Sequence, residues 1–357
     1  MAEKFPQGAA PQENKMGVLP IGRLLTNMAV PMMISMLVQA CYNVVDSVFV
    51  AQISEDALNA VSLAFPLQNL MIAFGAGTAV GINALLSRSL GEKNQAMADR
   101  AANTGIFLAL CNFALFALIG IFFSRTFFEL QAGGEQVIID YGVDYASICL
   151  GCSIGIFSQF CFERLLQSTG RTFLAMCTQL TGALINIVLD PILIFALNMG
   201  VRGAATATVI SQAVGAVWVL RFLTGSRTRL RLSVKNMPLV GKVIGPCLGL
   251  GVSTFVMIAT ESILSISFNS SLARYGGDIA VGAMTIITSA TQLLSMPVQG
   301  LCQGAQPIMS FNFGAGKGDR VKRAFRLQFI ICVGYAVAFW AACMLVPQMF
   351  ASIFSTD

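Results

Sequence analysis

Residues 183–197 read ALINIVLDPILIFAL, an apolar run that carries one acid, Asp190, and one amide, Asn186. If this run crosses a bilayer, an Asp near its centre costs about 2.5–3.5 kcal/mol on membrane-insertion scales. Acids inside membrane helices are rare and usually functional, so Asp190 marks a candidate functional site. Asn186 lies four residues earlier and therefore on the same face of a helix. The run thus predicts both a membrane helix and a polar site within it.

The composition of the whole chain indicates a multi-pass membrane protein with an all-α fold. Hydrophobic residues make up 56% of its 357 residues and charged residues only 11%, whereas soluble proteins carry roughly 25% charged residues. A membrane helix needs about 20 mainly apolar residues. We predict nine such spans, at roughly 25–51, 57–86, 102–123, 142–162, 173–197, 203–223, 244–268, 279–309 and 325–348.

The basic residues predict the orientation of these spans. With the N-terminus in the cytoplasm, all but three of the 22 Lys and Arg residues fall on cytoplasmic segments, the exceptions being Arg125, Arg202 and Arg274. Cytoplasmic loops of membrane proteins are enriched in Lys and Arg. We therefore predict a protein of the cell (inner) membrane with a cytoplasmic N-terminus. The same distribution explains the net charge of +5 without a nucleic-acid partner.

A weak internal repeat appears when the sequence is shifted by 223 residues. Residues 57–101 then align without gaps with residues 280–324, and three of the matched pairs are glycines: Gly77 with Gly300, Gly81 with Gly304, and Gly91 with Gly314. Six spans separate the copies, an even number, so the two repeats would be parallel, as in transporters built from two similar halves. We expect the second repeat to be truncated after its third helix.

The repeat divides the chain into four predicted regions. Residues 1–20 form a disordered cytoplasmic N-terminus, and residues 21–223 form an N-lobe of six helices. Residues 224–243 form a basic cytoplasmic linker, and residues 244–357 form a partial C-lobe with helices seven to nine.

Three carboxylates lie well inside the predicted spans: Asp46, Asp190 and Glu261. Counted from the outer ends of their spans, all three lie roughly 8–11 Å below the outer surface, at 1.5 Å per residue. Thr208 lies at a similar depth. Another acid, Glu163, lies near a cytoplasmic span end beside Arg164, where we expect a satisfied boundary pair.

Oxygen atoms of Asp46, Asn186, Asp190 and Thr208 would suit a hard cation such as Na⁺ or a transferable proton. Burial and a neighbouring acid both favour proton uptake by a carboxylate. Gln39, Asn43 and Asp46 share one helix face and would extend this polar surface. The alternative is that the acids only form hydrogen bonds with neighbouring helices.

Several motifs carry a resemblance to a known family. Span 5 contains NIVLDP at 186–191, and span 8 ends in GLCQGAQPIMSFNFG at 300–314. Shorter matches are LGEK at 90–93, QSTGRT at 167–172, GVRGAATAT at 200–208, and Pro31 with Asp46 in span 1. Over about residues 20–357 the sequence resembles the multidrug and toxic compound extrusion (MATE) transporters.

The resemblance implies twelve helices in two six-helix lobes, and export of drugs or organic cations in exchange for Na⁺ or H⁺. It implies a cation site at Asp46, Asn186, Asp190 and Thr208, with Glu261 as a further coupling acid. We accordingly expect no cofactor other than the coupling ion. We expect membrane lipid and a small organic cation as partners, no nucleic acid, and a monomer.

Four alternative interpretations of the function remain open at this point. A lipid-linked oligosaccharide flippase of related fold would be expected to have a more basic cavity. A membrane-embedded enzyme would need a nucleophile and base or a metal cluster, and the chain contains no His. A receptor or scaffold would leave the repeat and the acids at equal depth unexplained. The chain could also be a non-functional fragment of a transporter.

Overall fold

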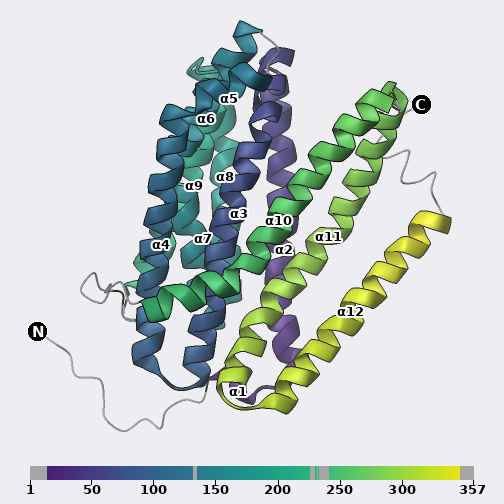
Figure 1. Cartoon of the computed structure of the whole chain (residues 1–357). Coiled ribbons are helices and arrows are strands. Elements are labelled where there is room, and N and C mark those ends of the chain that lie inside the picture. Colours follow the sequence, from purple (N-terminus) through teal and green to yellow (C-terminus); the bar gives the residue numbers. More distant parts are fainter. Residues whose placement is uncertain are drawn as a thin grey trace, which may run out of the picture.

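The computed structural model describes residues 14–131, 135–225, 230, 232, 241–275 and 277–345, and every regular element in these residues is a helix (Figure 1). The order is α1 (Lys15–Val18), α2 (Ile21–Ala51), α3 (Glu55–Gly91), α4 (Gln95–Phe122), α5 (Ser124–Gln131), α6 (Gln136–Gly151), α7 (Ile154–Ser168), α8 (Thr172–Pro191), η1 (Ile192–Ala196), α9 (Val201–Leu223), α10 (Gly241–Tyr275), α11 (Gly277–Gly314) and α12 (Gly318–Leu345).

Most of the predicted membrane spans are present as long apolar helices. Within the described residues, seven helices are long and apolar enough to cross a membrane, and the bent pair α6–α7 would make an eighth. The remaining predicted span, at 279–309, coincides with α11, a continuous helix of 38 residues in which several side chains are not described. The protein is therefore a multi-pass, all-helical membrane protein, and the full count of nine stays a prediction.

Two spans differ in shape from the straight helices that the sequence predicts. The span predicted at 142–162 is broken, because α6 ends at Gly151, α7 begins at Ile154, and the two are bent by 44°. Glycine weakens a helix interior, which favours a break at this point. In span 5, helix α8 passes at Pro191 into the π-helical turn η1. Proline has no backbone N–H to donate, so the regular α-helical ladder cannot continue unchanged there.

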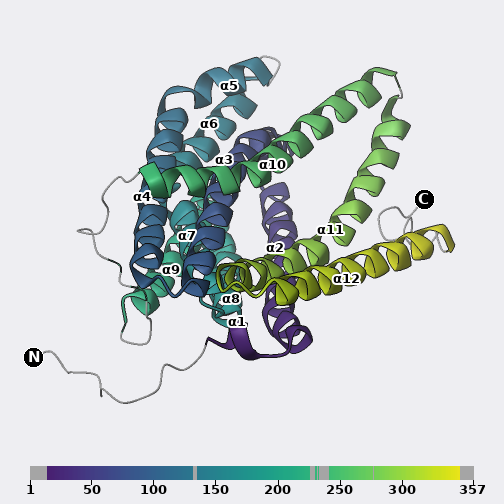
Figure 2. The ribbon, with the colours of Figure 1, turned by 60° about the horizontal axis from the view of Figure 1, so that its bottom comes forward.

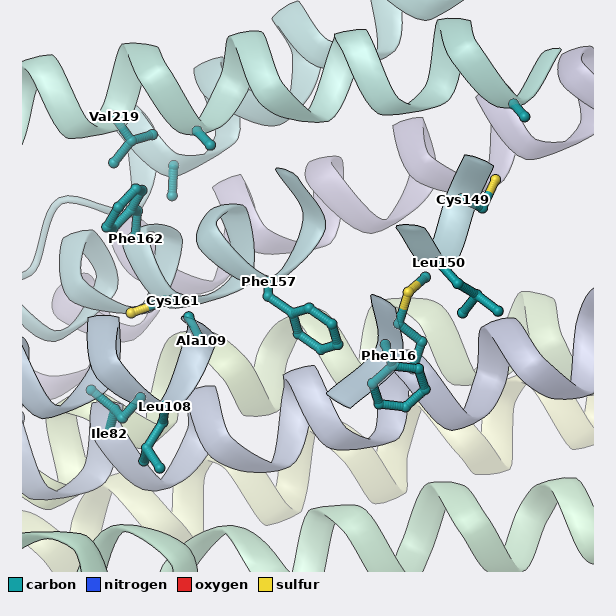
Figure 3. Close-up of a cluster of buried hydrophobic side chains, with 14 of the residues drawn as sticks. Ile82, Leu108, Ala109, Phe116, Cys149, Leu150, Phe157, Cys161, Phe162 and Val219 are labelled. Carbon is teal, nitrogen blue, oxygen red and sulfur yellow. The ribbon is translucent and has the colours of Figure 1, made fainter. Parts of the chain in front are cut away.

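Helices α2 to α9 form a bundle around one apolar core. The core contains Phe116 from α4, Leu150 from α6 and Phe157 from α7, all of them buried. Figure 3 shows these side chains pointing toward one another between their helices. The ring centroids of Phe116 and Phe157 are 5.5 Å apart. The bundle is thus a well-packed unit that can hold polar side chains in fixed positions.

Helices α10 to α12 pack against this bundle from one side. Helix α10 lies along α3, α11 lies along both α2 and α3, and α12 packs mainly on α11. Helices α11 and α12 meet the bundle near α1, whereas α10 crosses α3 farther from α1, and all three lean away from the bundle toward the opposite end, as both Figure 1 and Figure 2 show. A second apolar cluster joins the two parts near α1, with Met16, Leu24, Ile308, Phe311 and Ala324 among its members.

Near its N-terminus the structure differs from one predicted boundary, that of the disordered segment. We expected residues 1–20 to be disordered, but residues 15–18 form α1, and Met16 is fully buried. The Asn14 side chain caps this helix by accepting a hydrogen bond from the Met16 N–H at 3.2 Å. Residues 1–13 and most of the predicted linker at 224–243 lie outside the described residues.

Candidate functional site

The structure brings three of the predicted site residues together between α8 and α9. Asp190 and Asn186 are buried on α8, with 0% and 1% of their surface exposed. The Asn186 Nδ2 donates to Asp190 Oδ1 at 3.4 Å and to Thr208 Oγ1 of α9 at 3.5 Å. These distances lie at the long limit for hydrogen bonds. The cluster is therefore assembled but loosely bonded.

Asp46 faces this cluster from α2. Helix α2 packs along α8, and the carboxylates of Asp46 and Asp190 are close enough to repel each other. Within the described residues, Asp46 Oδ1, Asn186 Oδ1 and Asp190 Oδ2 are buried and have no hydrogen-bond donor. A buried acceptor without a donor costs about 1–3 kcal/mol, and more when it is charged. The site thus collects buried oxygen atoms that can accept a proton or a cation.

The structure adds three residues that the sequence interpretation missed. Tyr42 of α2 and Tyr145 of α6 both lie close enough to Asp46 to interact electrostatically with its carboxyl group. The Gln68 side chain of α3 donates to the Tyr145 hydroxyl oxygen at 2.8 Å. Tyr42 could have been found, because it lies four residues before Asp46 on the same helix face. Gln68 and Tyr145 come from other helices, and their sequence positions give no sign of the contact.

The two predicted supporting residues differ in their surroundings. Gln39 is half-buried, and its Oε1 accepts a hydrogen bond from Gln179 Nε2 of α8 at 2.8 Å. Asn43 is exposed on α2. Gln39 therefore links α2 to α8 beside the site, whereas Asn43 points away from protein packing.

Two acids stand apart from the cluster. Glu261 is exposed on α10, which packs mainly along α3 rather than on the site helices. Glu163 and Arg164 are both buried on α7, and each bonds to a glutamine rather than to the other. Gln159 Nε2 donates to Glu163 Oε1 at 2.9 Å, and Arg164 Nη1 donates to Gln167 Oε1 at 2.9 Å. The expected boundary ion pair is thus replaced by two amide contacts.

The donor set limits the ions that the site can bind. Among the described residues, no group of three or more His, Cys, Asp and Glu side chains is arranged to hold a metal ion. The cluster instead offers two carboxylates, an amide oxygen and a hydroxyl. Such oxygen ligands suit hard cations, while soft thiolates and imidazoles suit transition metals.

The fold is that of a multi-pass membrane protein, and comparison with known families identifies the class of protein. The MatE family model matches residues 31–192 and 253–357. The chain therefore belongs to the MatE family of multidrug efflux transporters. The membership supports a transporter and not an enzyme.

Similar proteins include two of stated export function. The chain is 27% identical over 343 residues to "Multidrug export protein MepA" of Staphylococcus haemolyticus (strain JCSC1435), covering 94% of this chain and 74% of that protein. It is 24% identical over 340 residues to the protein of the same name from Staphylococcus aureus (strain NCTC 8325 / PS 47), covering 95% and 74%.

Solved structures share the fold. One is described as "Outward-facing conformation of a multidrug resistance MATE family transporter of the MOP superfamily", with a TM-score of 0.89 at 24% identity, covering 98% of this chain and 77% of that one. Another is a MOP superfamily transporter from Pyrococcus furiosus whose reversed binding-pocket polarity is said to suggest a different function. Its TM-score is 0.87 at 24% identity, again covering 98% and 77%.

Proposed function

We propose that this chain is a secondary active antiporter that exports drugs or other organic cations in exchange for Na⁺ or H⁺. The observation that carries the proposal is the cluster of α2, α8 and α9, where oxygens of Asp46, Asn186 and Asp190 lack a donor among the described residues. Binding a proton or Na⁺ would relieve the cost of burying them. The relatives described as multidrug export proteins support the direction of transport.

In the proposed cycle the coupling ion and the cationic substrate compete for the same negative charge. The helices that meet near α1 and separate at the other end are consistent with an outward-open form (Figure 1). In that form an ion from outside neutralises Asp46 and Asp190, which removes their attraction for a bound cation. The substrate then leaves, and the lobes rock to the inward-open form. A ligand shifts such an equilibrium only by binding one form more tightly than the other.

We infer the orientation from the charges at the two ends. The end near α1 carries Lys15, Arg23 and Arg320. Because basic residues are enriched on the cytoplasmic side of membrane proteins, we place this end on the cytoplasmic side of the cell membrane. At the other end, Arg125 pairs with an acid of its own helix and Arg202 pairs with Asp144 of α6. Those two arginines are thus locally neutralised.

Two parallel repeats would account for the arrangement of the helices. A shift of 223 residues moves the bounds of α3 to 278–314 and those of α4 to 318–345, within one residue of α11 and α12. Equivalent residues also meet, because Asn83 Nδ2 donates to Gln306 Oε1 at 3.3 Å across a separation of 223 positions. A residue that contacts its own counterpart lies near the axis that relates the two copies. Such an axis is the one around which rocking lobes would pivot.

We further propose that the transporter works as a monomer in lipid, with the coupling ion as its only required ion and no nucleic-acid partner. The ion is cargo and is released on the other side of the membrane. Glu261 stays a candidate coupling acid, separate from the cluster.

A flippase for lipid-linked oligosaccharides is the second candidate, because one structural neighbour is said to differ in function through reversed pocket polarity. An anionic lipid-linked cargo would favour basic residues at the site. Here the cluster contains two acids and no Lys or Arg among the described residues that form it. The charge therefore favours cationic cargo.

Purified protein in proteoliposomes tests the proposal. A Na⁺ gradient or a pH gradient is imposed separately, and the movement of a fluorescent organic cation is followed. We expect one gradient to drive uphill movement of the cation. Movement of a fluorescent lipid-linked oligosaccharide, but not of the cation, would favour the flippase, and transport of neither under any gradient would contradict both candidates.

A further inference from the structure

Helix α1 is held by three side chains from the end of α11, the start of α12 and the turn between them. Arg320 Nη2 donates to Leu19 O at 2.7 Å and to Met16 O at 3.2 Å. Asn312 Nδ2 also donates to Met16 O, at 3.0 Å, and Lys317 Nζ donates to Gly17 O at 2.9 Å. The last four carbonyl groups of a helix have no N–H donor within the helix, so a helix of four residues leaves most of its carbonyl groups to be satisfied by other donors. These donors therefore supply the bonds that a short helix lacks.

Two of these donors, Arg320 and Asn312, hold each other in position. Arg320 Nε donates to Asn312 Oδ1 at 2.9 Å, and the Asn312 side chain is fully buried. Asn312 Nδ2 also bonds to the carbonyl of the preceding helical turn, Ile308 O, at 2.8 Å. The guanidinium thus bridges α1 and the end of α11 through planar, charge-assisted hydrogen bonds. We call Asn312, Lys317 and Arg320 the α1 clamp.

The other side of α1 contacts the bundle. The Met16 side chain lies against Gly170 in the α7–α8 turn, where a side chain added to the glycine would be 3.7 Å from Met16 Cγ. Gly17 lies against the ring of Phe311 at the end of α11. Helix α1 therefore fills the space between a turn of the bundle and the turn that joins α11 to α12, at the lower end of Figure 1.

The helices themselves approach closely at the same end. A Cβ atom added to Gly91 of α3 would collide with the carbonyl oxygen of Phe311, and one added to Gly314 of α11 would collide with that of Arg88. Backbones pack this tightly in membrane proteins where glycine permits it. This end is thus closed by α3 against α11, with α1 docked over the closed contact.

We propose that the α1 clamp is a positioning device for transport, which docks α1 across both lobes and holds the cytoplasmic end closed. Opening this end requires α11 to move away from α3, and the bonds to Met16, Gly17 and Leu19 must then break or travel with α11. The proposal rests on the proposed alternating access. A few polar contacts at the edge of an apolar cluster form a local unit that can open without unfolding the bundle.

Amide hydrogen exchange of the reconstituted full chain tests the docking of α1. Arg320→Gln removes three donated bonds from one side chain, so exchange in residues 14–24 should quicken by about tenfold or more. Arg323→Gln is the matched control, because Arg323 is exposed on the same helix and has no bond to α1 among the described residues. Arg320→Lys keeps the charge but not the fork of donors and should give an intermediate rate.

A distance measurement tests whether docking controls closure. Spin labels on Ala96→Cys of α4 and Lys322→Cys of α12, with the reactive native cysteines replaced, report the separation of the two lobes at this end. Both positions are exposed. The Arg320→Gln variant should gain a population with a longer distance, and the Arg323→Gln variant should not.

The outcomes separate the clamp from the proposed function. Unchanged exchange in Arg320→Gln overturns the docking role, and faster exchange with an unchanged lobe distance overturns the control of closure. If Arg320→Gln does not fold, the same two readouts on Arg320→Lys and Lys317→Gln decide the matter. If wild type moves no organic cation while both readouts change as expected, the antiport proposal fails and the clamp stands.

Discussion

The bundle of α2–α9 and the helices α10–α12 are made of equally apolar sequence but are used differently. In the most apolar part of α3, 67% of residues are buried inside the protein, whereas in that of α12 none are. The bundle encloses Asp190, which has no exposed surface, while Glu261 on α10 is exposed. Apolar composition alone therefore marks a membrane helix, and only packing decides whether an acid on it can form a site.

The largest difference between the two regions should appear in transport. Asp46→Asn removes a charge from the buried cluster, so we expect at least a tenfold loss of organic-cation export, about 1.4 kcal/mol or more of coupling. Glu261→Gln is the matched change at the separate candidate acid of α10 and, because that side chain is exposed, should lower export by less than about threefold. Drug resistance of cells expressing equal amounts of each variant measures this. A greater loss in Glu261→Gln than in Asp46→Asn would reverse the assignment.

The next largest difference should appear in how much buried apolar side chains of the two regions contribute to the free energy of unfolding. Phe116→Ala empties a fully buried position in the bundle and should lower the free energy of unfolding by about 3–5 kcal/mol. Phe329→Ala on α12 changes a side chain that is 58% exposed and should have little effect. Thermal unfolding in detergent measures both. Equal losses would mean that α12 is packed as tightly as the bundle.

The contact between the two regions should be sensitive to side-chain size. A Cβ atom added to Gly81 of α3 would collide with the carbonyl of Cys247 in α10. Gly81→Val should therefore destabilise the protein by about 1–3 kcal/mol. Gly249→Val is the control, since the space around Gly249 is open within 4 Å. The same thermal assay compares them, and a stable Gly81→Val variant would show that α3 and α10 are not in close contact.

The smallest effect is expected at the exposed end of the bundle. Arg202 donates two bonds to the Asp144 carboxylate, at 2.8 and 2.9 Å, but its side chain is largely exposed. Exposed ion pairs contribute little to stability because solvent screens them. Arg202→Gln should therefore shift the unfolding temperature only slightly and leave export unchanged, and a strong loss of export would give this pair a role beyond surface pairing.

Most of the fold could be predicted from the sequence because apolar length determines membrane helices directly. The run at 183–197 also located Asp190 and Asn186 correctly on one helix face, and counting residues from span ends brought Thr208 to the same depth. The break after Gly151 and the π-helical turn after Pro191 could not be placed in advance, since each depends on the local backbone geometry and on the neighbouring helices. Glycine and proline mark such points without fixing their geometry.

The site was less accessible to sequence reasoning where it depends on lateral packing. Equal depth predicts that Glu261 joins Asp46 and Asp190, but depth says nothing about which helices are neighbours, and α10 packs along α3. The contact between Gln68 and Tyr145 joins residues 77 positions apart. The burial of Met16 was missed because α1, with four residues, is too short to show an apolar pattern of helical period.

The central claim is that the buried carboxylate of Asp190 couples ion entry to cation exit. Its most direct test is gradient-driven transport of a fluorescent organic cation by wild type and by Asp190→Asn, reconstituted side by side in proteoliposomes. The account predicts that the imposed ion gradient accelerates export by the wild type and has no effect on Asp190→Asn. Export by Asp190→Asn that responds to the gradient as strongly as wild type would contradict it.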